Sequence, residues 1–90
     1  MSEARITLLT RAGCTACATA AVALDRLCPE LRVGWRAIDV DAEATRGNRE
    51  LRMEFGDRLP VVLLDGAEHS YSEVDESRLR SDLARPRGSA

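Results

Sequence analysis

The chain has 90 residues, of which 44% are hydrophobic and 31% charged, and its formal net charge is −2. This length fits one domain with a modest core, and this composition is typical of a soluble globular protein rather than a disordered one. The charge balance gives no reason to expect a nucleic acid or an anionic membrane as a partner. All thirteen basic residues are arginines, which excludes lysine-based catalysis.

The first residues and the cysteines both bear on where the protein is located. Residues 1–5 lack the charged-then-apolar pattern of a secretory signal, and no apolar run reaches the roughly 20 residues that span a bilayer. We therefore expect a cytoplasmic protein. Three cysteines are too few for a disulfide scaffold, and a close pair in a reducing compartment is more typical of catalysis or metal binding.

The first half of the chain begins with an apolar, β-branched run over 5–10 that predicts a buried strand. Gly13 then permits a turn. Small and apolar residues at helical spacing predict a helix from Cys17, and we expect Pro29 to end it because proline disfavours helical geometry at the residue before it.

The remaining predicted elements are a strand over 32–40, a helix over 44–55, two strands over 59–64 and 68–72, and a helix over 76–84. Gly47 and Asn48 weaken the helix over 44–55. The Asp65-Gly66 pair is a strong hairpin signal, and Asp75 is the predicted N-cap of the last helix. We expect residues 85–90 to form a flexible tail.

The predicted order β-α-β-α-β-β-α indicates an α/β fold in one domain, residues 1–90. A helix between the first two strands implies that they are parallel, whereas the Asp65-Gly66 hairpin makes the last two antiparallel. The expected fold is a four-stranded mixed sheet flanked by helices. This is the order of the minimal thioredoxin fold.

The Cys14-Thr15-Ala16-Cys17 motif lies between the first strand and the first helix. A C-x-x-C motif there is typical of thioredoxin-like redox chemistry, since one helical turn brings both sulfurs within bridging reach. At a helix N-terminus, free N–H groups and the helix dipole favour the Cys14 thiolate, which is the nucleophile of disulfide exchange. Cys17, one turn further, is the expected resolving thiol.

A zinc site is the weaker alternative, because only Cys28 and His69 remain as further ligands. Cys28 lies about 16 Å along the helix from Cys17, at 1.5 Å per residue, so it cannot join the pair. We expect Cys28 to be a core residue. His69 follows the hairpin turn, where we expect an exposed edge residue without a proton-transfer role.

The motif from Thr10 to Cys17, followed later by Leu59-Pro60-Val61, resembles the glutaredoxins, and the chain is similar to short bacterial glutaredoxin-like proteins of the thioredoxin superfamily over residues 5–84. The resemblance implies that Pro60 is a cis-proline facing the disulfide and that the Leu59 backbone binds an extended thiol substrate. It also implies that Arg11 stabilises the Cys14 thiolate and pairs with a glutathione carboxylate.

Two other features bear on the resemblance. Arg11 is equally well interpreted as a solvated loop charge, and Arg58 is a weaker candidate for the same cationic role. The chain departs from glutaredoxins in having no tyrosine inside the C-x-x-C motif and no Gly-Gly pair over 70–75, which leaves glutathione specificity open.

The leading functional hypothesis is a monomeric thiol–disulfide oxidoreductase with no bound cofactor and no metal. Cys14 attacks a disulfide-bearing protein or a glutathione mixed disulfide, Cys17 resolves the intermediate, and glutathione is a candidate reducing co-substrate. Two alternatives stay open: a non-catalytic binding or redox-sensing module, and metal or cluster binding through Cys14 and Cys17.

Overall fold

The computed structural model of the chain describes residues 4–84, so the flexible tail expected over 85–90 lies outside the described residues. The described elements are β1 (Ala4–Thr10), α1 (Thr15–Leu31), β2 (Gly34–Asp39), α2 (Val40–Thr45), α3 (Glu50–Phe55), β3 (Val61–Leu64), β4 (Ala67–Tyr71) and α4 (Glu76–Leu83). Within this part of the chain, no helix combines the length and the apolar character needed to cross a bilayer.

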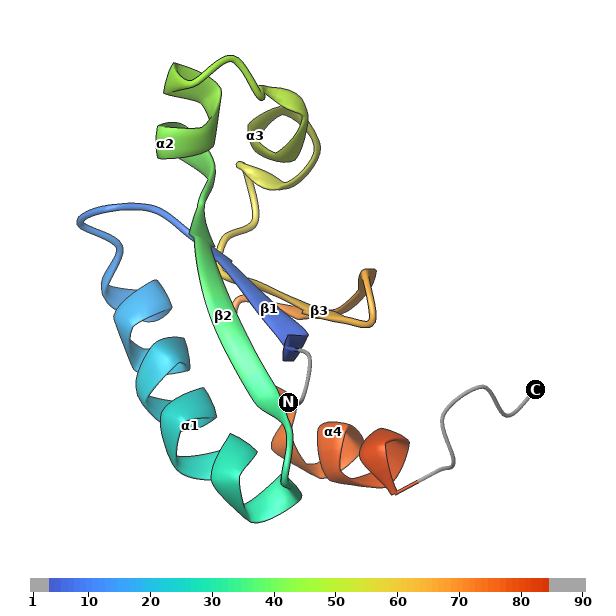
Figure 1. Cartoon of the computed structure of the whole chain (residues 1–90). Helices are drawn as coiled ribbons and strands as arrows, with labels where there is room; N and C mark the ends of the chain where they lie inside the picture. The colour runs from blue at the N-terminus through green and yellow to red at the C-terminus, as the bar shows by residue number, and fades with distance from the viewer. Residues whose placement is uncertain (1–3, 85–90) are drawn as a thin grey trace.

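The strands form one mixed sheet in the order β2-β1-β3-β4, which confirms the predicted α/β fold (Figure 1). β1 is parallel to β2 and antiparallel to β3, and β4 is antiparallel to β3. The turn between β3 and β4 has φ 51° at Asp65 and 87° at Gly66. Positive φ at both central residues is what a tight hairpin turn requires, so the hairpin prediction is also confirmed.

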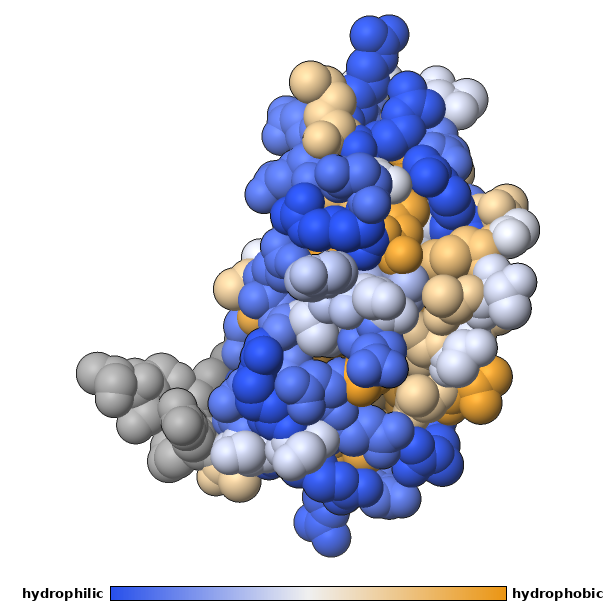
Figure 2. All heavy atoms as spheres, turned by 180° about the vertical axis from the view of Figure 1, so that it is seen from behind, coloured by the Kyte–Doolittle hydropathy of each residue, from blue (hydrophilic) through white to orange (hydrophobic). Residues whose placement is uncertain are grey.

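The core lies on both faces of the sheet because side chains of β1 alternate between them. Ile6 and Leu8 pack with buried residues of α1 and with Leu79 of α4. Leu9 packs on the opposite face with Val40 and Phe55, which come from α2 and α3. The surface seen from behind is largely hydrophilic, most clearly at the end that carries α2 and α3 (Figure 2).

Helix α1 continues two residues past Pro29, so the prediction that Pro29 ends it is wrong. Proline removes one donor, but the turn that follows is closed by two backbone bonds, from Arg32 N–H to the Pro29 carbonyl and from Val33 N–H to the Cys28 carbonyl. Arg32 adopts the left-handed φ of 58° that this helix ending needs and that glycine usually supplies.

The predicted helix over 44–55 is two short helices, α2 and α3, and this prediction is corrected. Helix α2 begins four residues earlier because the Asp39 carboxylate accepts hydrogen bonds from the backbone N–H groups of Asp41 and Ala42. It ends before Gly47, whose φ of 104° does not belong to a helix. Asn48 N–H then donates to the Glu43 carbonyl and closes the turn.

His69 is buried, with 8% of its surface exposed, so the expectation of an exposed edge residue is wrong. The pairing of β4 with β3 shifts by one residue at His69, which therefore occupies a β-bulge. Its Nε2 lies 2.8 Å from a carboxylate oxygen of Asp82 on α4, and the Arg78 guanidinium donates to its backbone carbonyl. The bulge thus turns His69 towards α4 rather than towards solvent.

Candidate active site

The loop between β1 and α1 places Cys14 at the start of the helix. Gly13 has φ 76°, a left-handed conformation that side chains disfavour, and Cys14 returns to extended geometry as the N-cap residue. The Cys14 Sγ accepts a hydrogen bond of 3.1 Å from the Cys17 backbone N–H. A helix N-terminus therefore directs a donor at this sulfur, as the motif predicted.

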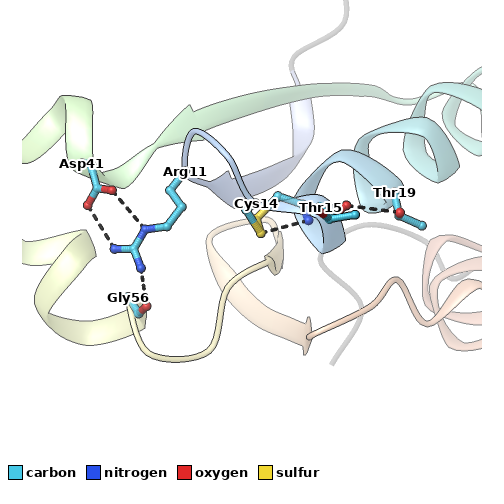
Figure 3. Close-up of a disulfide and its surroundings, with 7 residues drawn as sticks. Arg11, Cys14, Thr15, Thr19, Asp41 and Gly56 are labelled. Atoms are coloured by element: carbon cyan, nitrogen blue, oxygen red, sulfur yellow. Dashed lines mark hydrogen bonds and ion pairs between the residues drawn. A yellow bond between two sulfur atoms is a disulfide. The ribbon is translucent and has the colours of Figure 1, made fainter.

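Cys14 and Cys17 are joined by a disulfide, with their Cα atoms 5.2 Å apart (Figure 3). The two sulfurs have different surroundings. Cys17 is 2% exposed and lies in the buried face of α1, whereas Cys14 is half-buried. A second molecule therefore reaches Cys14 more readily than Cys17.

The segment before β3 carries the other residues that the resemblance singled out. The Leu59–Pro60 peptide bond is cis, which confirms the expected isomer. Pro60 is fully buried, and its carbonyl accepts a 2.8 Å hydrogen bond from the Ser72 N–H, which ties this segment to the end of β4. Leu59 is half-buried, and among residues 4–84 its backbone forms no hydrogen bond. Substrate binding by Leu59 and Pro60 stays a prediction.

Arg11 lies in the loop before Cys14, but its side chain extends towards α2 and α3 (Figure 3). Its Nε and Nη2 each lie 3.0 Å from a different carboxylate oxygen of Asp41, and its Nη1 donates to the Gly56 carbonyl at 3.3 Å. Hydrogen bonding by Arg11 lowers the pKa of Asp41, which therefore stays ionised at neutral pH. The described geometry thus commits Arg11 to an internal carboxylate, and its role towards substrate stays a prediction.

Arg58, the second cation of the predicted site, is also paired internally. Its Nη2 and Nε lie 3.0 and 3.3 Å from the two carboxylate oxygens of Glu68 on β4, and its Nη1 donates to the Glu54 carbonyl. Its guanidinium also lies over the Phe55 ring, 5.2 Å from the centroid. Arg58 therefore fastens α3 to β4.

Sequence reasoning did not identify Asp41 as part of this region. Asp41 is separated from Arg11 by thirty residues, and no local pattern connects a loop arginine to an aspartate at the start of a later helix. The available signal was the acidic Asp39-x-Asp41 pair at a helix start, where acidic residues are ordinary. The fold makes the connection by placing α2 beside the loop.

A cleft of about 340 Å³ lies between the first turns of α1 and the segment that precedes α4. Its lining residues are Ala16, Thr19, Ala20, Ala23, Ser72, Glu73, Val74 and Glu76. Ala16 belongs to the C-x-x-C motif, whereas neither Cys14 nor Cys17 lines this cleft. The wall from α1 carries small side chains, and the opposite wall includes the carboxylates of Glu73 and Glu76.

Cys28 lies apart from the pair, as predicted. It is 1% exposed and belongs to the core cluster that also contains Leu24 and Leu27. Burial, together with the negative charge of Asp25, raises the pKa of Cys28 to about 11. Across residues 4–84, no three His, Cys, Asp or Glu side chains are grouped so as to hold a metal ion.

The chain is similar to known proteins both in sequence and in fold. An uncharacterised protein of Mycobacterium tuberculosis is 60% identical over 85 residues, covering 94% of this chain and 88% of that protein. A mutated buckwheat glutaredoxin has a similar structure, with a TM-score of 0.60 and 14% identity over 91% of this chain and 74% of that one. Fasciola hepatica thioredoxin has a TM-score of 0.54 at 23% identity, covering 88% and 76%.

The structural neighbours establish the fold, and the family match extends along nearly the whole chain. The model of the family described as Glutaredoxin-like domain (DUF836) matches residues 5–84. This range contains both cysteines of the motif and the cis-proline segment. The chain therefore belongs to the Glutaredoxin-like domain family, and its fold is the one found in glutaredoxins and thioredoxins.

Proposed function

We propose that this chain is a thiol–disulfide oxidoreductase in which Cys14 is the nucleophile and Cys17 the resolving thiol. The observation that carries the proposal is the geometry of the pair: Cys14 is the half-buried N-cap of α1 and accepts the Cys17 N–H, while Cys17 is buried one turn later. A donor and the positive end of a helix favour thiolate at Cys14 after reduction. Membership of the glutaredoxin-like family supports the same chemistry.

The proposed reaction proceeds in two exchange steps. The Cys14 thiolate attacks one sulfur of a substrate disulfide, forming a mixed disulfide and releasing the other half as a thiol. Cys17 then loses its proton and attacks the Cys14 sulfur, which forms the Cys14–Cys17 disulfide and releases the second thiol. The substrate gains two electrons and the protein loses two, so two external thiols must reduce the pair before the next cycle.

The proposed substrates are disulfide-bearing proteins or glutathione mixed disulfides, with glutathione as a candidate reductant and no bound cofactor. The Leu59 backbone, which forms no hydrogen bond with any residue of 4–84 and adjoins the buried Pro60, is the proposed contact for an extended substrate. We place this activity in a monomeric protein of the cytoplasm. A free, buried Cys28 is compatible with a reducing compartment.

The test is a redox titration of the purified protein in graded glutathione buffers. Thiols are trapped with acid and an alkylating reagent, and the cysteines are mapped by mass spectrometry. The proposal predicts a Cys14–Cys17 disulfide that titrates at one potential while Cys28 stays free. If both thiols of the pair stay reduced across the cytosolic range, the oxidoreductase assignment fails.

Serine variants separate the roles of the two cysteines. We expect Cys14→Ser to abolish disulfide reduction because no nucleophile remains, and Cys17→Ser to accumulate a mixed disulfide on Cys14 because nothing resolves it. Both are followed by substrate reduction and by intact mass, with Cys28→Ser as the control that keeps the pair. Activity that survives Cys14→Ser would contradict the assignment.

A non-catalytic binding or sensing module is the second candidate, and the pairing of Arg11 with Asp41 favours it. With that guanidinium occupied, Cys14 loses the cation that would stabilise its thiolate. This function predicts an ordinary thiol pKa for reduced Cys14 and no reductase turnover. The rate of Cys14 alkylation against pH measures the first, and the assay above measures the second.

A further inference from the structure

Arg11 is the nearest basic residue before Cys14 in the sequence. Its guanidinium could bind an anion through two parallel N–H groups, but these groups are already occupied. Two parallel N–H groups bind the two oxygens of Asp41, each at 3.0 Å. This is the bidentate geometry that arginine offers to any carboxylate. The remaining nitrogen donates to the Gly56 carbonyl. A substrate carboxylate would therefore have to displace Asp41.

Asp41 is held in place by more than this contact. It lies in the first turn of α2, where its own N–H donates to the Asp39 carboxylate at 2.9 Å. Arg52 on α3 adds a second cation, with its Nη1 3.8 Å from an Asp41 oxygen. Because Asp41 is part of the chain, it binds Arg11 without the entropy loss that a free anion would incur. Asp41 therefore competes effectively with a free anion for the Arg11 guanidinium.

The other charged groups of the candidate site do not attract anions either. Arg58 is bound to both oxygens of Glu68. In the cleft lined by Ala16, Glu76 is paired with Arg26, whereas Glu73 makes no ion pair with any described residue. The uncompensated charge of the cleft wall is therefore negative, which repels a carboxylate.

From these contacts we propose that Asp41 is a specificity-determining residue that makes the site discriminate against thiol reagents and disulfides carrying a carboxylate near the reacting sulfur. The inference rests on the proposed function and names its substrate class: neutral or cationic disulfides, such as those of protein segments without acidic residues beside the cysteine. Asp41 acts through Arg11, by occupying the guanidinium that would otherwise bind an approaching carboxylate.

The test uses two alkylating reagents that differ in charge, iodoacetate and iodoacetamide. The Cys14 thiolate displaces iodide from either reagent, so the ratio of the two rate constants on the reduced protein reports how the site treats a carboxylate. We expect Asp41→Asn to raise the iodoacetate rate relative to the iodoacetamide rate by about threefold or more at low ionic strength. The gain should shrink in about 0.5 M salt because screening weakens exposed charges.

Three further variants assign the effect. In Arg11→Gln/Asp41→Asn the gain should disappear, because the released guanidinium causes it. Asp41→Glu keeps the charge and should stay close to the wild-type ratio. Asp25→Asn removes an exposed carboxylate from a different helix, α1, and serves as the control for net charge. Circular dichroism of each variant checks that the fold is retained.

An Asp41→Asn ratio equal to that of the wild type overturns the proposal, and so does an equal rise in Asp25→Asn. The proposed function fails by a different result, the absence of a Cys14–Cys17 disulfide in the redox titration. Alkylation needs the Cys14 thiolate alone, so the charge discrimination is measured even if the protein turns over no disulfide.

Discussion

The three cysteines differ in their surroundings although all belong to one helix or its cap. Cys14 is half-buried at the N-terminus of α1, Cys17 is buried one turn later, and Cys28 is buried near the other end. These differences separate their chemistry. In the proposed reaction Cys14 reacts with other molecules and Cys17 reacts with Cys14, whereas Cys28 contributes packing.

The raised pKa of Cys28 predicts a loss of stability at alkaline pH. The folded state keeps the thiol proton up to about pH 11, against an ordinary value of 9.0, because burial disfavours the thiolate. Below pH 9 the thiol is protonated in both the folded and the unfolded state, so the free energy of unfolding is unaffected. As the pH rises from 9 towards 11, only the unfolded state releases the proton, and the free energy of unfolding falls by about 2 kcal/mol.

Urea unfolding of the oxidised protein at neutral pH and near pH 11 measures this loss, with Cys28→Ala as the comparison that lacks the titrating thiol. The wild type should lose more stability between the two conditions than the variant does. Equal losses would show that Cys28 ionises as easily in the folded state as in the unfolded one.

Single residues were predictable where the signal was local. Cys14 and Cys17 are three residues apart, so their spacing and their position before a helix sufficed to bring them together. The partner of Arg11 was not predictable, because Asp41 belongs to a different element. The burial of His69 depends on a bulge in β4, and no residue type in that strand marks a bulge.

Helix α4 offers a test of capping. The Asp75 carboxylate accepts the Arg78 N–H at 3.1 Å, which confirms the predicted N-cap. We expect Asp75→Ala to lower the free energy of unfolding by about 1 kcal/mol because that N–H loses its acceptor. Asp75→Asn keeps an acceptor and should cost less in the same urea titration. Equal effects of the two substitutions would show that capping does not determine the stability of this helix start.

The helices also show where local signals end. Gly47 and Asn48 marked a weak point in the predicted helix over 44–55, and the chain breaks there because Gly47 adopts positive φ. The early start of α2 was not anticipated, since Asp39 was assigned to the preceding strand. Proline disfavours a continuing helix, but at Pro29 this preference did not decide where α1 ends. Two backbone hydrogen bonds from the residues after it close one further turn.

At the scale of the whole molecule, α4 joins the core through the buried Leu79, and the half-buried Leu83 packs against the same cluster. Leu79 is fully buried, and it is the buried residue of α4 that joins the cluster beneath α1. We expect Leu79→Ala to lower the free energy of unfolding by about 3 kcal/mol through lost contacts and a cavity. The total free energy of unfolding of a domain of this size is roughly 5–10 kcal/mol, so this loss would be a large part of it.

Urea unfolding measures the effect of Leu79→Ala, and Val22→Ala is the matched control. Val22 is 70% exposed on α1, so its truncation should change stability by less than about 0.5 kcal/mol. If Leu79→Ala costs no more than this control, α4 does not contribute to the cooperative core.

The topology was predictable because each step depended on a short signal. The helix between the first strands required a parallel pair, and Asp65-Gly66 required a hairpin. The ion pairs that join distant segments, such as Arg11 with Asp41 and Arg58 with Glu68, arise only once the sheet and helices are packed. The fold and the cysteine pair were therefore predictable from the sequence, whereas these ion pairs could be found only in the folded structure.

The bulge at His69 has a consequence for how molecules of this protein meet at high concentration. β4 is an outer strand of the sheet, and outer strands with a regular row of free backbone groups can recruit another chain into a continuous sheet. Here the row is interrupted in the middle, and Arg78 already holds the carbonyl of the bulged residue. The same contact that fastens α4 to the sheet thus protects the protein against edge-to-edge aggregation along β4.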